Sequence, residues 1–201
     1  MLIRSIRILR VPFTVLTYHQ KCSKEESPRK GQGNDGINIF VTGKIRNNLK
    51  MEIYHGSYTT IPMPEIKKSQ FTKDFGDGFY CTELRRQAEK WAKRYDTPVV
   101  NIYDYQQDGT LNILRFEEMT DEWLDFIVAC RSGKPHDYDI VIGAMANDQV
   151  YNYVADFING VLTREQFWVL AKFKYPTHQI NFCTPRALRC ITFKGNEEII
   201  R

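Results

Sequence analysis

From Met51 onward, short strand patterns and amphipathic helical patterns follow one another without a regular order, and this succession constrains the fold most. Neither an internal repeat nor a strict alternation of strand and helix is present, so a regularly wound parallel sheet is not expected. The sequence predicts the α+β class. We expect six strands, at residues 52–54, 99–105, 111–116, 138–142, 179–183 and 189–193.

Four amphipathic helices and one hairpin complete the prediction. Gln107-Asp108-Gly109 separates two expected strands, which is typical of a β-hairpin. Capping residues and breakers set the helix limits. We expect helices between Thr82 and Pro98, between Thr120 and Gly133, from Asn147 or Asp148 to Gly160, and after the capping box Thr163 to Gln166.

Charge is distributed unevenly along the chain. Residues 1–50 hold ten Lys and Arg against three Asp and Glu, a net charge of +7. The totals of 28 basic and 24 acidic residues leave 18 and 21 for residues 51–201, a net charge of −3. The near-neutral part does not favour nucleic-acid binding. We expect residues 1–50 to be a basic, disordered extension, or the product of a start codon assigned too early, and residues 51–201 to be the folded domain.

Cysteine use and hydropathy bear on the cellular setting. The five cysteines form no CxxC pair and are odd in number, which favours reduced thiols over a disulfide framework. His19, His136 and His178 lack metal-ligand spacing, so we expect no metal. No apolar run is long enough to span a bilayer, and no cleavage site follows the short run at residues 11–16. We expect a cytoplasmic protein with no membrane partner.

Two short motifs have the letters of well-known nucleotide sites in the wrong context. Residues 31–36 fit G-x-G-x-x-G, but charged residues precede them where a dinucleotide site requires a buried strand. Asp74-Phe75-Gly76 spells the magnesium triplet of protein kinases, yet no glycine-rich loop, strand lysine or His-Arg-Asp loop accompanies it. A Rossmann dinucleotide site and a kinase are therefore excluded.

The strongest chemical signal is Tyr54-His55-Gly56-Ser57 followed by the glycine-rich turn at residues 74–80. Gly56 leaves a backbone amide and carbonyl open to a ligand, because it has no side chain. His55 can hydrogen-bond a hydroxyl, and Tyr80 offers a flat ring for stacking. These groups are suited to holding NAD by its nicotinamide end.

These motifs resemble the histidine-tyrosine branch of the ADP-ribosyltransferase superfamily. His55-Gly56-Ser57 matches its early strand motif, and Gly76-Asp77-Gly78-Phe79-Tyr80 matches its turn; Trp91, eleven residues further, takes the place of a second aromatic residue. The order of motifs over residues 51–201 is closest to an uncharacterised bacterial family of that superfamily. The resemblance implies a split β-sandwich with flanking helices and NAD as co-substrate.

The resemblance also implies a reaction and a set of residues. A mono-ADP-ribosyltransferase would cleave the bond between nicotinamide and ribose and transfer ADP-ribose to a macromolecule, protein or nucleic acid. A neutralising partner protein would fit a toxin-like setting. The implied catalytic residues are His55, Tyr80, Asp148 and Gln179. The implied NAD-binding residues are His55, Gly56, Ser57, Gly78, Tyr80, Trp91 and Arg131.

Gln179 departs from the superfamily, which normally has a glutamate at the start of this late strand. A glutamine can accept a hydrogen bond from the ribose 2′-OH, but it supplies no negative charge to a developing oxocarbenium ion. Three alternatives therefore stay open. They are an NAD-binding or interaction module without chemistry, an NAD glycohydrolase, and nucleic-acid binding through the basic extension.

Several of these residues also have a purely structural interpretation. Tyr80 and Trp91 would fit core positions, and Gln179 would fit a polar strand end. Asp148 could cap the helix that it opens. Arg131 could meet a pyrophosphate or form a structural ion pair with Asp139.

Overall fold

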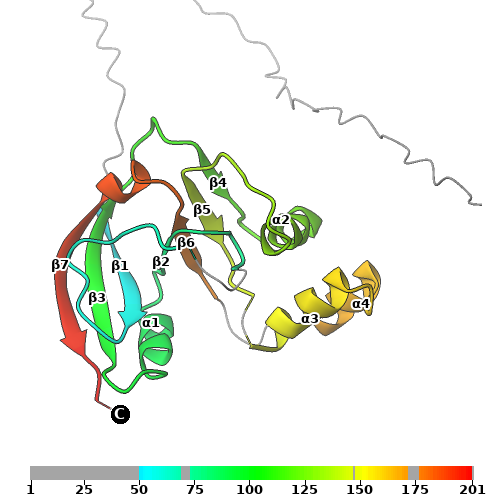
Figure 1. Ribbon diagram of the computed structural model, residues 1–201, viewed down its shortest axis with the longest axis horizontal. Coiled ribbons are helices and arrows are strands. Elements are labelled where there is room, and N and C mark those ends of the chain that lie inside the picture. The colour runs from blue at the N-terminus through cyan, green and yellow to red at the C-terminus, as the bar shows by residue number, and fades with distance from the viewer. Residues whose placement is uncertain (1–49, 69–72, 147, 172–176, 201) are drawn as a thin grey trace, which may run out of the picture. The chain divides into compact units, whose positions relative to one another are not determined.

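The computed structural model describes residues 50–68, 73–146, 148–171 and 177–200. These residues form four α-helices and two small sheets with seven strands in all (Figure 1). The predicted α+β class is confirmed. Residues 1–49 of the predicted basic extension (residues 1–50) lie outside the described residues, and so does the predicted helix cap Asn147.

The first sheet has three strands and a helix on its outer face. It consists of β1 (Lys50–Ser57), β3 (Val99–Gln106) and β7 (Ile191–Glu198), antiparallel and in the order β1-β3-β7. On β3, Val100 and Ile102 face α1 (Arg85–Ala92), which buries Ala88 and Ala92 against them. Successive strand residues alternate between faces, so Tyr103 lies on the opposite side.

The second sheet has four strands and shows that the predicted hairpin is wrong. It consists of β2 (Phe79–Cys81), β6 (Gln179–Phe182), β5 (Ile140–Gly143) and β4 (Ile113–Arg115), in the order β2-β6-β5-β4. β4 pairs with β5 in parallel rather than with β3, so the segment at residues 107–109 passes from one sheet to the other. Local alternation predicts a strand, but it does not choose the strand's partner.

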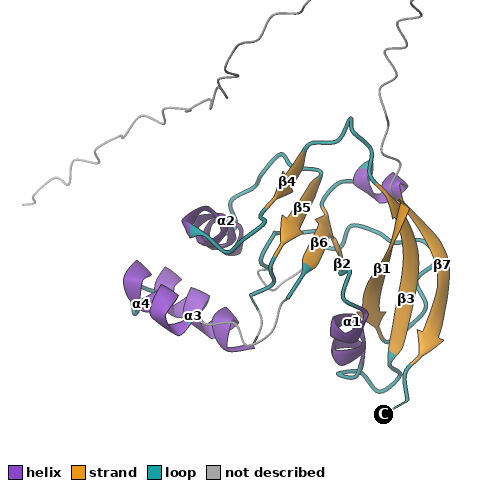
Figure 2. Cartoon of the chain, turned by 180° about the vertical axis from the view of Figure 1, so that it is seen from behind, coloured by secondary structure: helices purple, strands orange, loops and turns teal. Residues whose placement is uncertain are grey.

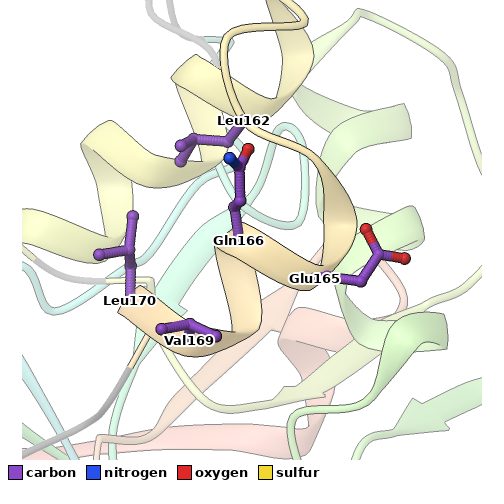
Figure 3. Close-up of a pocket in the computed structure, with 5 residues that line it drawn as sticks. All are labelled: Leu162, Glu165, Gln166, Val169 and Leu170. Carbon is purple, nitrogen blue, oxygen red and sulfur yellow. The ribbon is translucent and has the colours of Figure 1, made fainter.

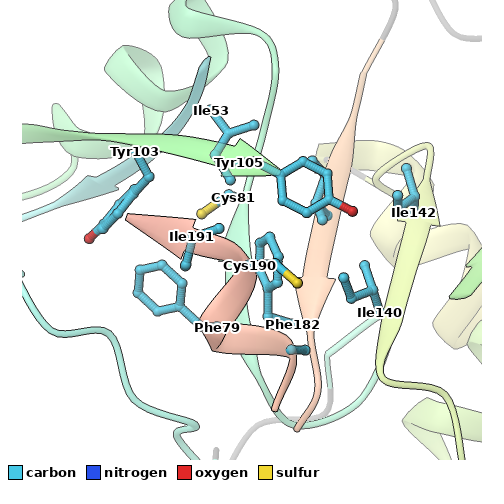
Figure 4. Packing of buried hydrophobic residues seen from close by; sticks show 12 residues of the cluster. Ile53, Phe79, Cys81, Tyr103, Tyr105, Ile140, Ile142, Phe182, Cys190 and Ile191 are labelled. Atoms are coloured by element: carbon cyan, nitrogen blue, oxygen red, sulfur yellow. The ribbon is translucent and has the colours of Figure 1, made fainter. Parts of the chain in front are cut away.

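The two sheets face one another across a shared core (Figure 4). Ring pairs join them: Phe79 of β2 meets Tyr103 of β3 edge to face at 5.6 Å between centroids, and Tyr105 of β3 meets Phe182 of β6 at 5.5 Å. The short 3₁₀ helix η1 (Ala187–Cys190) closes one end of this core. Burial between the sheets thus accounts for the apolar face of nearly every strand.

Three helices cover the other face of the four-stranded sheet, on the side away from the three-stranded sheet (Figures 1 and 2). They are α2 (Asp121–Arg131), α3 (Asp148–Ile158) and α4 (Arg164–Leu170). Trp123, Val154 and Phe167 are fully buried in this layer. The predicted capping box from Thr163 to Gln166 is confirmed at the start of α4.

The described residues also answer two smaller predictions. Cys81, Cys130, Cys183 and Cys190 are free thiols. In the same residues, every helix is too short or too polar to cross a membrane.

Candidate functional site

β1 and β2 meet at a single point and then separate. Tyr54 and Thr82 exchange two backbone hydrogen bonds, with N···O distances of 2.8 and 2.9 Å. An antiparallel ladder would next place Gly56 opposite Tyr80, but the pairing is an isolated bridge and does not continue. We call residues 55–57 of β1 and 79–80 of β2 the strand fork.

The alternation of the ladder decides which backbone groups face the strand fork. Tyr54 directs its N–H and C=O to Thr82, so the next residue along β1 directs its own groups to β3. Gly56 then directs its N–H and C=O away from β3, into the strand fork. A donor and an acceptor on one residue are what a carboxamide group requires.

Gly56 also has a structural reason to be glycine. A Cβ atom there would lie 2.2 Å from the carbonyl oxygen of Ala88 and 2.9 Å from the nitrogen of Ala92. Only glycine lets α1 pack this closely on β1. The adjacent Ser57 is buried, and its Oγ accepts a hydrogen bond from the Thr59 N–H at 3.4 Å.

His55 is held in one orientation inside the strand fork. Its ring stacks on Phe79 at 4.5 Å between centroids, and Nδ1 lies 2.6 Å from the carbonyl oxygen of Tyr80. Since a carbonyl only accepts, Nδ1 carries the proton. Burial lowers the pKa of His55, the ammonium groups of Lys73 and Lys67 act in the same direction, and the bond to Tyr80 opposes them. The neutral ring therefore keeps Nε2 as an acceptor for a hydroxyl.

Residues 74–78 of the glycine-rich turn are fixed by side chains from distant parts of the chain. The Phe75 ring is fully buried. The backbone carbonyl oxygen of Phe75 accepts hydrogen bonds from Asn181 Nδ2 at 2.8 Å and from His136 Nε2 at 3.2 Å. The turn is therefore a rigid support beside the strand fork.

Both glycines of this turn are required by its geometry. Gly76 has φ of 74°, in the left-handed region that favours glycine. A Cβ atom on Gly78 would lie 2.0 Å from Asn181 Oδ1. The turn needs Gly78 for this close approach, and its contact with NAD stays a prediction.

Tyr80 braces the turn with its hydroxyl. The oxygen accepts from the Phe75 N–H at 3.1 Å and donates to the Gly76 carbonyl at 2.7 Å. Burial raises the pKa of Tyr80 well above its ordinary value, so the hydroxyl stays protonated. Lys73 Nζ lies 5.0 Å from the ring centroid, and burial lowers the pKa of this lysine. A ligand stacked on that face of Tyr80 would have to displace the ammonium.

Gln179 opens β6, as predicted, but its side chain is only partly available. The residue is 4% exposed, and its Nε2 donates to Asp74 Oδ2 at 3.1 Å and to the Ala144 carbonyl at 3.2 Å. Both protons of the amide nitrogen are thus used inside the protein. The acceptor Oε1 is the atom left for a ligand hydroxyl.

Arg131 forms an ion pair that differs from the predicted one. Its side chain is 3% exposed, and Nε donates to Asp74 Oδ1 at 3.0 Å, joined by a second guanidinium nitrogen. A third nitrogen donates to the Tyr151 carbonyl at 3.0 Å. The predicted pair with Asp139 is wrong, because Asp139 binds Arg186. Burial, together with hydrogen bonds from all three guanidinium nitrogens to protein acceptors, also argues against contact with a pyrophosphate.

The strand fork, the turn and Gln179 all lie within one family match. Residues 51–193 match the family described as "Protein of unknown function (DUF3990)". The chain belongs to the DUF3990 family. No curated protein and no solved structure matches it.

Two further predicted site residues of this DUF3990 domain lie on helices. Trp91 on α1 is 41% exposed, and the Arg94 guanidinium carbon lies 4.3 Å from its ring centroid. The interpretation of Trp91 as a core residue is therefore wrong, and its stacking on nicotinamide stays a prediction. Asp148 is the first residue of α3. Its side chain lies outside the described part of the DUF3990 domain.

Sequence reasoning missed the roles of Asp74 and Asn181. Asp74 belongs to the glycine-rich turn and to the false kinase motif, but neither assigns a role to its side chain, and Asn181 lies in a strand whose other residues are mostly apolar. One signal was present: Arg131 follows Ile127 by four residues, on the buried face of its helix. A buried arginine requires an acidic partner, although periodicity cannot say which one.

Elsewhere the described residues of the DUF3990 domain offer an apolar hollow but no metal cluster. The hollow, of about 390 Å³, is lined by Leu162, Glu165, Gln166, Val169 and Leu170 (Figure 3). All five come from α4 and the segment just before it, without converging polar groups from other elements. Within the described ranges, no three His, Cys, Asp or Glu side chains come together as a metal site requires.

Proposed function

We propose that this DUF3990 domain is an NAD-dependent mono-ADP-ribosyltransferase with the split β-sandwich of that superfamily. The strand fork carries the proposal, because it sets the backbone donor and acceptor of Gly56 beside a neutral His55 with a free ring acceptor. Two small sheets around one core support the fold. The acceptor of ADP-ribose would be a macromolecule, protein or nucleic acid.

NAD would enter the strand fork by its nicotinamide end. The carboxamide would donate to the Gly56 carbonyl and accept from the Gly56 N–H. Nε2 of His55 would accept from a ribose hydroxyl, since Nδ1 is already bound to the backbone. Tyr80 and the exposed ring of Trp91 would supply the stacking surfaces.

The reaction would be a substitution at C1′ of the nicotinamide ribose. The C1′–N1 bond breaks, and its electron pair neutralises the positive charge of the nicotinamide ring. A nucleophile of the acceptor forms the new bond to C1′ and loses a proton to solvent. Because the leaving group departs neutral, holding the ribose in place, with Oε1 of Gln179 at the 2′-OH, would provide much of the rate enhancement.

A second candidate is an NAD-binding module without chemistry. Gln179 favours it, because the amide supplies no negative charge and uses both of its N–H groups inside the protein. The two candidates predict the same binding and different turnover.

Substitution of His55 by asparagine separates its structural and ligand roles. An asparagine amide can still donate to the Tyr80 carbonyl, as Nδ1 does, but it has no atom at the place of Nε2. We expect His55→Asn to keep the thermal stability of the protein and to lose at least ten-fold in nicotinamide release from NAD. His55→Gln, which restores an acceptor near Nε2, should recover part of it.

The assay incubates the full chain with labelled NAD and cell lysate and measures free nicotinamide and labelled macromolecule. His178→Asn is the matched control, since His178 makes its contacts with Glu83 and Gln87. Binding of NAD by calorimetry without nicotinamide release would establish the second candidate. Release of free ADP-ribose without labelling would indicate a glycohydrolase. The absence of both NAD binding and nicotinamide release would refute the proposal.

A further inference from the structure

Asp74 is a buried carboxylate whose acceptor capacity is filled. Oδ1 receives two guanidinium nitrogens of Arg131, and Oδ2 receives the Ala146 N–H at 2.9 Å and Gln179 Nε2 at 3.1 Å. A carboxylate offers about four lone-pair sites, so four donors satisfy it. The side chains of Arg131 and Asp74 are 3% and 7% exposed, so solvent does little to weaken the arrangement.

These contacts allow only one orientation of the Gln179 amide. Asp74 Oδ2 and the Ala144 carbonyl oxygen are both acceptors, so the group between them must be the NH₂. Rotating the amide by half a turn would set three oxygens against one another. The acceptor Oε1 of Gln179 therefore points away from Asp74 Oδ2 and from the Ala144 carbonyl oxygen.

We propose that Asp74, which Arg131 holds in place, is the positioning residue of the candidate NAD site. Because of Asp74, position 179 of this site requires glutamine rather than glutamate. Asp74 touches no ligand; it holds Gln179 so that Oε1 accepts from the ribose 2′-OH. The inference rests on the proposed function for the identity of the ligand. The coupling between the two side chains does not depend on it.

Glutamate at this position would meet the wrong neighbours. In Gln179→Glu a carboxylate oxygen would replace a donor that now lies 3.1 Å from Asp74 and 3.2 Å from a carbonyl oxygen. Two carboxylates sharing one site cannot both stay ionised in a buried setting. Gln179→Glu restores the glutamate that is usual in the ADP-ribosyltransferase superfamily. In this protein it should nevertheless lower both the stability and the affinity for NAD.

The test exchanges the two functional groups. Asp74→Asn and Gln179→Glu are made singly and together, and the double variant reverses donor and acceptor in the 3.1 Å hydrogen bond while keeping one negative charge in the buried group. We expect each single variant to lower the urea midpoint of unfolding and to weaken NAD binding at least ten-fold. The double variant should recover part of both losses, but not all, because the Ala146 N–H would then face a donor and the Ala144 carbonyl an acceptor.

The pH dependence of stability shows whether repulsion between two carboxylates causes the loss in Gln179→Glu. In Gln179→Glu the pKa of the new carboxyl is raised in the folded state above its unfolded value of about 4.3. The folded state then binds more protons, so the loss of stability is full at neutral pH and shrinks as the pH falls through the raised pKa. Gln87→Glu is the matched control, because both hydrogen bonds given for the Gln87 side chain among the described residues join it to the backbone of His178.

The control should show no coupling with Asp74→Asn. Additive losses in the double variant, or a loss in Gln179→Glu that does not change with pH, would overturn the proposal. If the variants couple in stability but the natural protein binds no NAD, the positioning contact stands and the proposed function fails. If NAD binds and the losses are additive, the positioning contact fails alone.

Discussion

Two arginine–aspartate pairs on the four-stranded sheet side of the molecule look equivalent in sequence but have opposite surroundings. Arg131 and Asp74 are both buried, at 3% and 7% exposure. Arg186 is 56% exposed, although its partner Asp139 is 4% exposed. The first pair joins α2 to the glycine-rich turn and to Gln179, whereas the second fastens the segment after β6 to the start of β5.

The difference in burial between the two pairs indicates which arginine the stability of the fold depends on. A buried pair that loses one member leaves an unsolvated charge, and this is more costly than losing the pair as a whole. A pair with one member in water loses little when the exposed member is removed, since water can take its place. The expected effects therefore differ most when the arginines, rather than the aspartates, are changed.

The largest expected effect comes from Arg131→Met. Asp74 would keep two donors but lose its counter-charge in a buried site, so we expect unfolding free energy to fall by about 3–5 kcal/mol. Urea denaturation followed by tryptophan fluorescence measures it. Arg131→Lys keeps the charge and should lose less. A loss below about 1 kcal/mol in Arg131→Met would show that the two pairs are equivalent after all.

A smaller, pH-dependent effect is expected for Asp139→Asn. Arg186 holds the pKa of Asp139 well below its usual value, with further hydrogen bonds from Thr184 and Asn112. A depressed folded pKa contributes stability above the unfolded pKa of about 3.9, and this is lost as the pH falls further.

At neutral pH Asp139→Asn should cost about 1–3 kcal/mol, as expected for a buried hydrogen-bonded acceptor. Urea denaturation between neutral and acid pH should show the natural protein and the variant converging below about pH 4. A gap that stays constant with pH would mean that the charge of Asp139 does not matter, and Thr184→Val tests the neutral contact separately.

The smallest effect is expected for Arg186→Ala. The guanidinium is exposed, so we expect a shift in Tm well below those of Arg131→Met and Asp139→Asn. Thermal unfolding at low and high salt measures it, and the gap from the natural protein should narrow as salt screens the pair. A shift as large as that of Arg131→Met would remove the distinction between the two pairs.

The class of fold could be predicted from the sequence because it depends on local patterns. The helix from Thr120 to Gly133 and the capping box at Thr163 are both found where hydrophobic spacing and capping residues place them. The predicted hairpin at residues 107–109 is wrong because it, too, was inferred from local patterns alone. A strand pattern specifies two faces but not a neighbour, and the neighbour was chosen by burial between two sheets.

The candidate site divides in the same way. The motifs around His55 and Tyr80 predict that these two segments form one site, and the isolated bridge from Tyr54 to Thr82 brings the segments together. The partner of Arg131 could not be predicted, because Asp74 is 57 residues away along the chain. Nor could the orientation of Gln179, which depends on two acceptors from other elements.

From the sequence alone one can predict the α+β class, the presence of four helices, and the chemical groups that surround the strand fork, since these follow from short-range periodicity and residue chemistry. The start of α1 is an exception, because Leu84 rather than Thr82 is its N-cap residue. The pairing of Arg131 with Asp74, and of Asp74 with Gln179, became known from the folded arrangement. The physical reason is that a buried charge or amide must find its partner among whatever groups the packed layers bring within hydrogen-bond distance.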